Sequence, residues 1–150
     1  PVERCRGGIV AISQQDELLR VDEQRSLLME SASLNWQVPL ETALQQAREI
    51  ASETGDLPRL SPVDLDVLAL AIDLNLPLVT DDYRMKNVAR KAGIPVEGVL
   101  TSGGKKQWKW ILRCIGCRAE EDVPPNAKQS KKDDVQLCDR CGSPMKLKKG

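Results

Sequence analysis

Two hydrophobic periods alternate along the first hundred residues. Short, continuous apolar runs, typical of strands, occur at 7–13, 34–39, 76–80 and 94–100. The run at 76–80 is apolar throughout, as in a strand buried on both faces of a parallel sheet. Between the runs, apolar residues recur three or four positions apart, which is helical spacing. Strands that alternate with helices predict an α/β fold: a parallel sheet flanked by helices, with right-handed connections.

The predicted helices have recognisable starts and ends. Ser13 is expected to cap the first helix, which has two acidic residues in its first turn. A second helix is expected over about 40–53. The clearest start is at Ser61, followed by Pro62 at the first helical position and an aspartate at the third. A short last helix ends at Gly93.

After residue 100 the pattern changes. A stretch with paired glycines and lysines at 101–107 is typical of a linker between a domain at 1–100 and a smaller module at 108–150. The module begins with a strand, "WKWILRC", and predicts a β-hairpin. Its polar, Lys-rich insert at 120–134 is expected to form a long loop.

Four of the five cysteines form two Cys-x-x-Cys pairs, separated by 20 residues. This is the spacing of a four-cysteine zinc ribbon, in which two tight turns present four thiolates to one tetrahedral Zn²⁺. Disulfides of a secreted domain and redox-active pairs are alternatives, but no secretory feature is present. A four-cysteine site has no open position, so the zinc is expected to be structural. The expected ligands are Cys114, Cys117, Cys138 and Cys141, with Cys5 left as a plain thiol.

The net charge of zero conceals two oppositely charged halves. Residues 1–100 carry 10 Lys and Arg against 16 Asp and Glu, whereas residues 101–150 carry 12 against 6. A basic module beside an acidic domain suits a protein that grips a polyanion with one part. Trp108 and Trp110 lie among the cations, although each could simply pack against the larger domain. The residues predicted to bind RNA are Lys105, Lys106, Trp108, Lys109 and Arg113.

The sequence contains no histidine. Ser-His-Asp triads, Cys-His proteases and His-bound zinc hydrolases are therefore excluded, and catalysis must use carboxylates, Lys, Cys or a bound metal. No apolar run approaches the roughly 18 residues that cross a bilayer, and the first residues do not resemble a signal peptide. A cytoplasmic protein with no membrane partner is expected.

Two adjacent aspartates, Asp81 and Asp82, follow the strand at 76–80. Sites in α/β sheets form at this carboxyl end, and Asp64, in the first turn of the preceding helix, could approach the same edge. Clustered carboxylates repel one another unless a cation shares the site, and Mg²⁺ or Mn²⁺ bound by oxygen ligands can activate water against a phosphodiester. The alternative is that each aspartate only favours or caps a helix start.

The stretch "LSPVDLDVLALAIDLNLPLVTDDYRMKNVARKAGI" resembles the C-terminal half of a PIN domain. With "ETGD" before it, "DDYxxxN" within it and a zinc ribbon after it, the chain is similar to the archaeal Nob family. These endoribonucleases cut the 3′ end of the small-subunit rRNA precursor. The resemblance implies a PIN-like α/β fold, with Asp64 and Asp82 as metal-binding catalytic acids and Asp81 adjacent. It also implies Glu17 as a further acid, with Asp16 competing, Mg²⁺ or Mn²⁺ as the catalytic metal, and the rRNA precursor and small ribosomal subunit as partners.

One feature departs from the family. The family's first strand ends in an Asp-Ser/Thr pair, whereas residues 1–15 contain no aspartate. This difference and the initial proline predict that an N-terminal segment of some tens of residues is missing, and that the chain without it could be inactive. Two functions remain open: a metal-dependent endoribonuclease, or a non-catalytic RNA- or ribosome-binding adaptor. The DDY stretch argues against a transcription-type zinc ribbon on an unrelated α/β domain.

Overall fold

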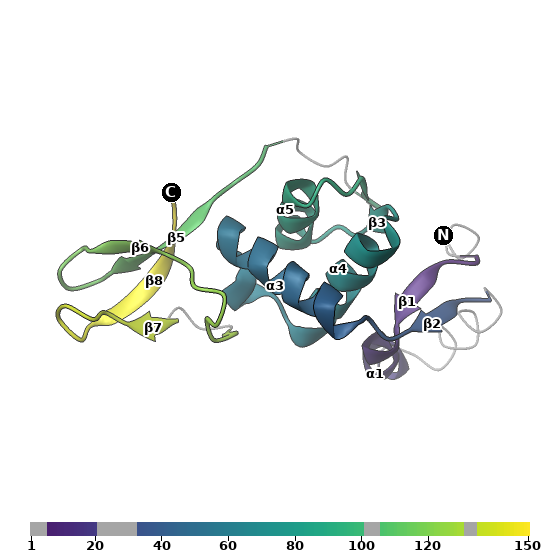
Figure 1. Ribbon diagram of the computed structural model, residues 1–150, viewed down its shortest axis with the longest axis horizontal. Helices are drawn as coiled ribbons and strands as arrows, with labels where there is room; N and C mark the ends of the chain where they lie inside the picture. The colour runs from purple at the N-terminus through teal and green to yellow at the C-terminus, as the bar shows by residue number, and fades with distance from the viewer. Residues whose placement is uncertain (1–5, 21–32, 101–105, 131–134) are drawn as a thin grey trace.

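The computed structural model is elongated, with a group of helices in the middle (Figure 1). A small antiparallel sheet forms one end, and two short strands near the N-terminus form the other. The expectations for Cys5 and Lys105 fall outside the described part of the chain, as does the first predicted helix beyond Arg20. The structure describes residues 6–20, 33–100, 106–130 and 135–150.

The strands near the N-terminus form a parallel pair. β1 (Ile9–Ala11) and β2 (Asn35–Gln37) run side by side in register. A 3-10 turn (Ile12–Gln14) and a short helix, α1 (Gln15–Leu19), follow β1. Both strands lie within the apolar runs that the sequence indicated.

The first helix starts differently from the prediction. The helical turn begins at Ile12, so Ser13 lies inside it and does not cap it. Instead, Gln14 Oε1 accepts a hydrogen bond from the backbone N–H of Ala11 at 3.0 Å. The Ser13 cap is therefore wrong, because a longer side chain one residue later reaches the N–H that precedes the turn.

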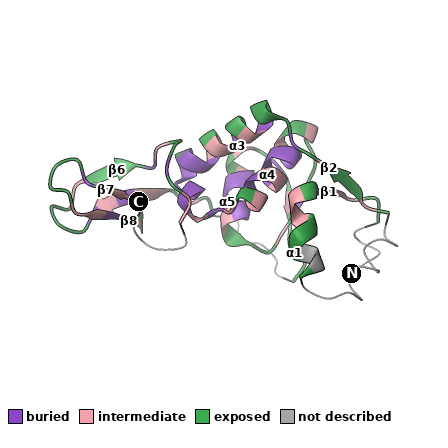
Figure 2. Ribbon diagram, turned by 90° about the horizontal axis from the view of Figure 1, so that it is seen from below, coloured by how far each residue is buried: buried purple, intermediate pink, exposed green. Residues whose placement is uncertain are grey.

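Three helices pack together to form the middle of the molecule: α3 (Glu41–Thr54), α4 (Pro62–Leu74) and α5 (Tyr83–Lys91). On α3 the buried face is a row of alanines four residues apart, and small side chains let α4 approach closely. Larger apolar side chains of α4 and α5 fill the space between the helices. Figure 2 shows the buried residues gathered where the three helices meet. These residues include Ala43, Ala47, Ala51, Leu65, Leu68 and Val88.

A second parallel pair joins β3 (Leu78–Val79) to β4 (Val96–Glu97). The α/β class with parallel pairing and flanking helices is confirmed, although the sheet is small: among the described residues, the two parallel pairs are separate. The prediction of a strand buried on both faces is wrong for β3. Leu78 is buried, whereas 58% of Val79 is exposed, because successive side chains of a strand point to opposite faces and the described residues cover only the face of Leu78.

The C-terminal module is a four-stranded antiparallel sheet in the order β6-β5-β8-β7. Its start is an antiparallel pair, as predicted, but the insert is not simply a loop. The insert begins with a strand at the edge of the sheet, β6. After this strand, the side chains of Val123 and Ala127 are buried. The strands are β5 (Trp110–Cys114), β6 (Glu120–Asp122), β7 (Gln136–Leu137) and β8 (Pro144–Lys149).

One apolar core runs from the helices into the C-terminal sheet, where Leu112 and Met145 continue it. Backbone hydrogen bonds reinforce the contact, since Ser130 N donates to Pro58 O at 2.7 Å. The module therefore packs directly on the larger domain. Among the described residues, no helix combines the length and the apolar composition needed to cross a membrane.

Candidate functional site

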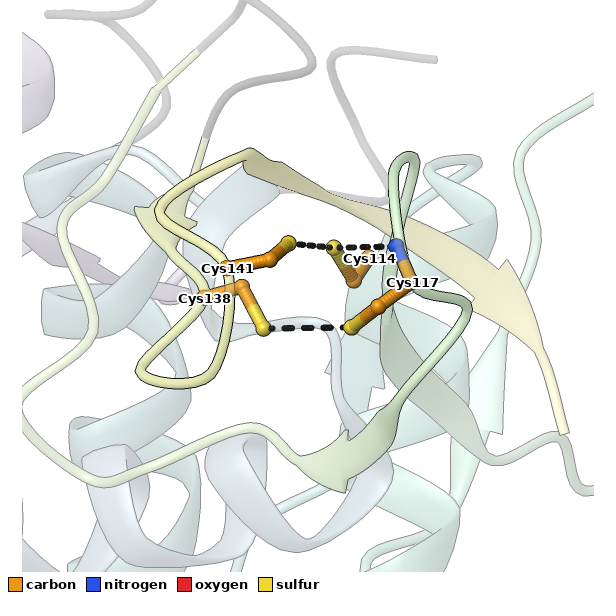
Figure 3. Close-up of side chains that lie close together, drawn as sticks. All are labelled: Cys114, Cys117, Cys138 and Cys141. Carbon is orange, nitrogen blue, oxygen red and sulfur yellow. Dashed lines mark hydrogen bonds between the residues drawn. The ribbon is translucent and has the colours of Figure 1, made fainter.

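The four cysteines of the two Cys-x-x-Cys pairs come together where the turn after β5 faces the turn between β7 and β8 (Figure 3). Their sulfur atoms all lie within 4.8 Å of one another, with Cys114 Sγ 3.4 Å from Cys141 Sγ and Cys117 Sγ 3.6 Å from Cys138 Sγ. A tetrahedral ion with metal–sulfur bonds of about 2.3 Å needs sulfur–sulfur distances of about 3.8 Å. The cluster therefore fits a tetrahedral four-thiolate metal site.

The backbone of each turn holds its sulfurs in place. The N–H groups of Gly116 and Cys117 donate to Cys114 Sγ at 3.3 and 3.4 Å. In the second turn, Gly142 adopts a φ of +71° and its N–H donates to Cys138 O at 2.8 Å. Both are tight turns of the kind that present two sulfurs to one ion.

Hydrogen bonds prepare two of these thiols to ionise. The side chain and backbone of Ser143 lower the pKa of Cys141 to about 6, and the backbone N–H of Cys141 lowers the pKa of Cys138. At Cys117 a backbone hydrogen bond from Ala119 acts in the same direction, but the neighbouring thiols and burial outweigh it and leave the pKa at about 11. The Cys117 thiol, crowded by its neighbours, therefore retains its proton, and a bound cation would displace that proton.

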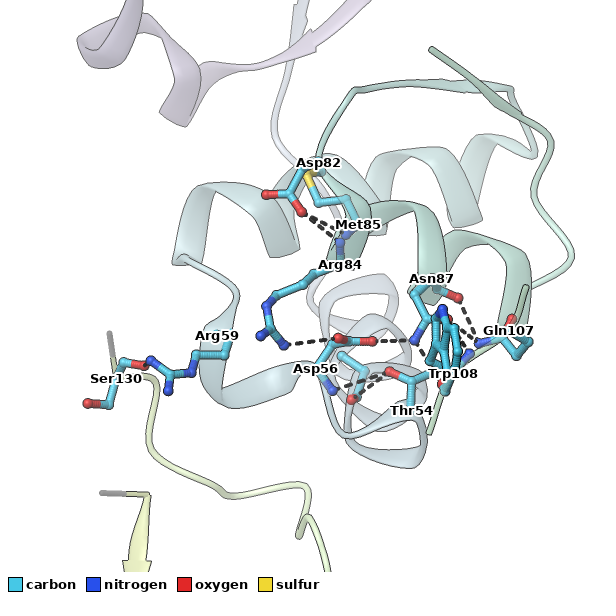
Figure 4. Close-up of polar contacts among 11 residues, drawn as sticks. Thr54, Asp56, Arg59, Asp82, Arg84, Met85, Asn87, Gln107, Trp108 and Ser130 are labelled. Carbon is cyan, nitrogen blue, oxygen red and sulfur yellow. Dashed lines mark hydrogen bonds and ion pairs between the residues drawn. The ribbon is translucent and has the colours of Figure 1, made fainter. Parts of the chain in front are cut away.

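Asp82 lies three residues beyond the end of β3 and caps α5 (Figure 4). Its Oδ1 accepts hydrogen bonds from the backbone N–H groups of Arg84 at 2.7 Å and Met85 at 3.3 Å. Within the described residues, Oδ2 has no hydrogen-bond partner. The cap therefore orients the carboxylate and leaves one oxygen available to a ligand.

Asp64 has a similar arrangement at the start of α4. Ser61 Oγ accepts a hydrogen bond from Asp64 N at 3.1 Å, and Asp64 Oδ2 accepts one from Ser61 N at 2.8 Å. This capping box confirms the predicted helix start. For Oδ1 of Asp64, the described part of the chain supplies no partner.

Asp81 has different contacts from its neighbour. Its carboxylate accepts hydrogen bonds from the backbone N–H groups of Val99 at 3.0 Å and Leu100 at 3.1 Å, and lies 3.8 Å from Lys86 Nζ. These contacts tie the loop after β4 to the end of β3. Of the two adjacent aspartates, Asp82 is the one whose second oxygen remains available.

Glu17, with Asp16 as the competing residue, is exposed in the first turn of α1. In the described segments, the cysteine cluster is the sole group of three or more His, Cys, Asp or Glu residues whose ligand atoms lie within 4.8 Å of one another. Glu17, Asp64, Asp81 and Asp82 are therefore not brought into one such group. They remain predictions as catalytic residues.

Side chains that were predicted to bind RNA already have partners within the C-terminal module. Lys109 Nζ lies 2.8 Å from Asp122, and Arg113 Nε lies 3.5 Å from Glu120. Such ion pairs at the surface are weak, so both cations could exchange partners. The Trp108 ring has a lysine over it, with the Nζ of Lys149 at 2.9 Å from its centroid. Lys106 lies at 5.8 Å from the same centroid.

A buried polar network between the two parts was missed by the sequence argument. Asp56 is fully buried and accepts hydrogen bonds from Asn87 Nδ2 at 2.6 Å and Arg84 Nη1 at 3.3 Å. Asn87 in turn accepts a hydrogen bond from Trp108 N at 2.8 Å and donates one to Trp108 O at 2.9 Å. Arg84 lies 5.0 Å from the ring centroid of Trp110, so both tryptophans take part in packing the module onto the larger domain. Asp56 ends the motif "ETGD", and Asn87 ends the motif "DDYxxxN". These motifs were the sequence signal that could have identified both residues.

Close to Asp82 is an open hollow of about 590 Å³. Two arginines and a tyrosine line it with Asp82, and of these the sequence pointed only to the tyrosine, through the motif "DDYxxxN". The lining residues are Arg59, Asp82, Tyr83 and Arg84.

Comparison with known proteins gives consistent matches. A family model described as "PIN domain of ribonuclease" matches residues 11–74. The chain is 37% identical over 131 residues to Endoribonuclease Nob1 of Pyrococcus abyssi, covering 84% of this chain and 75% of that protein. It is 35% identical over 136 residues to Endoribonuclease Nob1 of Methanocaldococcus jannaschii, and the match covers 88% of this chain and 64% of that protein. Ribonuclease VapC1 of Thermoplasma acidophilum is 40% identical over 106 residues, covering 69% and 48%.

Proposed function

The chain belongs to the Nob1 family of endoribonucleases, and from this premise we propose that it cleaves the 3′ end of the small-subunit rRNA precursor. Its partners would be that precursor and the small ribosomal subunit, in the cytoplasm. The relatives' names and the PIN ribonuclease match support the reaction class, cleavage of an RNA phosphodiester. The specific substrate is the part that we propose.

One observation carries the proposal: Asp64 and Asp82 each use one carboxylate oxygen to cap a helix, and the other has no partner among the described residues. The caps fix the orientation of both carboxylates at the starts of α4 and α5. The two free oxygens are the hard donors that would hold Mg²⁺ or Mn²⁺, which when bound supplies an activated water and stabilises the leaving oxygen. Glu17 would be a further ligand.

The C-terminal module would grip the RNA. Its four cysteines would hold a structural Zn²⁺, which leaves no open coordination position for catalysis. The cations of the module, with Trp108 among them, would bind phosphates, and Lys109 and Arg113 would exchange their present acidic partners to do so. Lys106, Lys109 and Arg113 are the described residues proposed for this role, with Lys105 as a further one.

A second function is kept because of one observation. The described acidic residues do not form a group of three, which would suit an RNA- or ribosome-binding adaptor that does not cut. In that case the basic ribbon supplies the affinity and the carboxylates serve only as helix caps.

The test is the Asp82→Asn variant in a Mn²⁺-dependent cleavage assay on a fragment of the small-subunit rRNA precursor that spans its 3′ end. Asparagine is also a good N-cap, so the fold is expected to be kept while the charge is lost. Cleavage should fall roughly a hundredfold or more, with RNA binding retained.

The matched control is Asp73→Asn, an exposed aspartate near the other end of α4, which should cleave as the unchanged chain does. Equal cleavage by Asp82→Asn would contradict the role of Asp82. No cleavage by any form, including one extended at the N-terminus, together with tight RNA binding, would favour the adaptor.

A further inference from the structure

The peptide bond between Leu60 and Ser61 is hydrogen-bonded at both ends. Its carbonyl, Leu60 O, accepts a hydrogen bond from Gln129 Nε2 at 2.7 Å. Its N–H, that of Ser61, donates to Asp64 Oδ2 at 2.8 Å. Because a peptide unit is planar and rigid, the direction of its C=O fixes the direction of its N–H. Gln129 and Asp64 are therefore linked through one rigid group.

Gln129 reaches this peptide from the insert of the C-terminal module, 69 positions away in the chain. The backbone of the insert is bonded to the same segment, since Ser130 N donates to Pro58 O at 2.7 Å. Two side chains earlier in the insert, Val123 and Ala127, are buried in the shared apolar core. The segment that presents the Gln129 amide is thus anchored on both sides.

The backbone around this peptide is extended and lies between two helical elements. Leu60 follows the 3-10 turn at Leu57–Arg59 with a ψ of 137°, and Ser61 is the N-cap of α4 with a ψ of 163°. The N–H groups at the start of a helix have no partner inside the helix. The orientation of this peptide therefore depends on the side chains that bond to it.

The capping box of α4 converts the orientation of the peptide into the orientation of a carboxylate. Asp64 Oδ2 is held by the Ser61 N–H, which leaves Oδ1 directed by that one bond and by the helix. A hydrogen bond to the C=O of a peptide also polarises the group, so that its N–H becomes a stronger donor. Loss of the Gln129 bond would let the peptide rotate and would weaken the hold on the carboxylate.

We propose that Gln129 is a positioning residue that sets the orientation of the Asp64 carboxylate through the peptide between Leu60 and Ser61. The proposal rests on the proposed function, because it takes Asp64 as an acid that would hold the divalent metal. It gives the C-terminal module a role in the reaction besides RNA binding. Such a role needs no contact with the reacting atoms, since a misplacement of about 1 Å can slow a reaction about a hundredfold.

The first test replaces the amide of Gln129 with a group of similar length that has no donor, in Gln129→Met. Amide hydrogen exchange, followed by NMR without metal or RNA, should show the Ser61 N–H exchanging about tenfold faster, because its bond to Asp64 is weakened. Exchange of the Leu68 amide, in the buried part of α4, should not change. Gln46→Met, at an exposed glutamine of α3, is the matched control and should leave Ser61 exchange unchanged.

The second test is the Mn²⁺-dependent cleavage assay with the same variants. Gln129→Met should lower kcat about tenfold and leave KM unchanged, because the orientation of a catalytic acid is altered and RNA binding is not. Gln129→Glu, which matches glutamine in size but cannot donate to Leu60 O when ionised, should behave in the same way. The zinc content of both variants should equal that of the unchanged chain.

Unchanged Ser61 exchange in Gln129→Met and Gln129→Glu would overturn the proposal, whatever the cleavage rate. Equally faster exchange at Ser61 and Leu68 would also overturn it, since the variant would then have loosened α4 as a whole. Asp64→Asn in the same assay tests the proposed function separately. If Asp64→Asn abolishes cleavage while faster Ser61 exchange in Gln129→Met leaves kcat unchanged, the positioning role is wrong and the role of Asp64 stands.

Discussion

Asp56 is the residue whose environment most clearly differs from what its type suggests. It is a fully buried carboxylate with hydrogen bonds to Arg84 and Asn87. Burial raises its pKa above the usual 3.8, because its hydrogen bonds and the Arg84 charge do not fully compensate for lost solvation. Removing one partner of such a buried pair typically costs about 3–5 kcal/mol. Asp56 therefore stabilises the contact between the two parts only as long as its partners are present.

The raised pKa of Asp56 predicts the direction in which the stability of the fold changes with pH. The native state takes up this proton at a higher pH than the unfolded state, so the stability linked to it is fully present below about 3.8 and is lost as pH rises through the raised pKa. We expect the free energy of unfolding lost in Asp56→Asn, measured with urea, to be larger near pH 4 than near pH 7. A loss that grows with pH would instead mean that attraction by Arg84 outweighs burial.

At the scale of elements, the end of α3 determines how the C-terminal module docks. Gly55 ends the helix with a φ of +79°, a left-handed conformation that glycine adopts without strain. A methyl group at this position would overlap the backbone carbonyl of Trp110. Close approach between the helix end and β5 thus requires glycine for a second, independent reason.

Two glycine substitutions separate these reasons. In Gly93→Ala the only expected cost is that of the left-handed backbone conformation, since no atom lies within 4 Å of the added carbon. This variant should lose about 1–2 kcal/mol of unfolding free energy. Gly55→Ala meets the same penalty and also the overlap, which should add roughly 1–3 kcal/mol and change tryptophan fluorescence as β5 moves away. Equal costs for the two variants, measured by urea unfolding, would show that the docking is loose.

At the scale of the whole molecule, the cysteine cluster and the helices share one apolar core. Cys114 and Cys138 are buried members of it, together with Leu112 and Met145 of the same sheet. A metal held by the four cysteines would organise the turns that carry them. A change at the metal site should therefore reach the larger domain.

Removal of the metal tests this coupling. Elemental analysis should find one zinc ion per chain, and Cys138→Ser should lose it. The midpoint of thermal unfolding should fall by at least about 5 °C in a single transition, because the shared core makes the two parts unfold together. Two separate transitions, with only the first one lowered, would mean that the parts are independent.

The features that the sequence by itself determined depend on residues that are close together in the chain. The start of α4 at Ser61, the end of α5 before Gly93 and the metal-binding spacing of the cysteines all depend on residues a few positions apart, or on two such turns. The tertiary structure decided the features that depend on distant partners. Asp56 lies 28 and 31 positions from its partners Arg84 and Asn87.

The two adjacent aspartates show the same division. Their position after a strand was readable from the sequence, but their different environments were not. The Asp81 carboxylate accepts hydrogen bonds from backbone N–H groups 18 and 19 residues away, whereas the partners of the Asp82 carboxylate among the described residues lie in the first turn of its own helix. Likewise, pairing across the sheet made a strand of the start of the insert, and packing on one face alone left Val79 exposed. Local patterns are set by backbone geometry and capping, whereas burial and pairing exist only once distant segments have packed together.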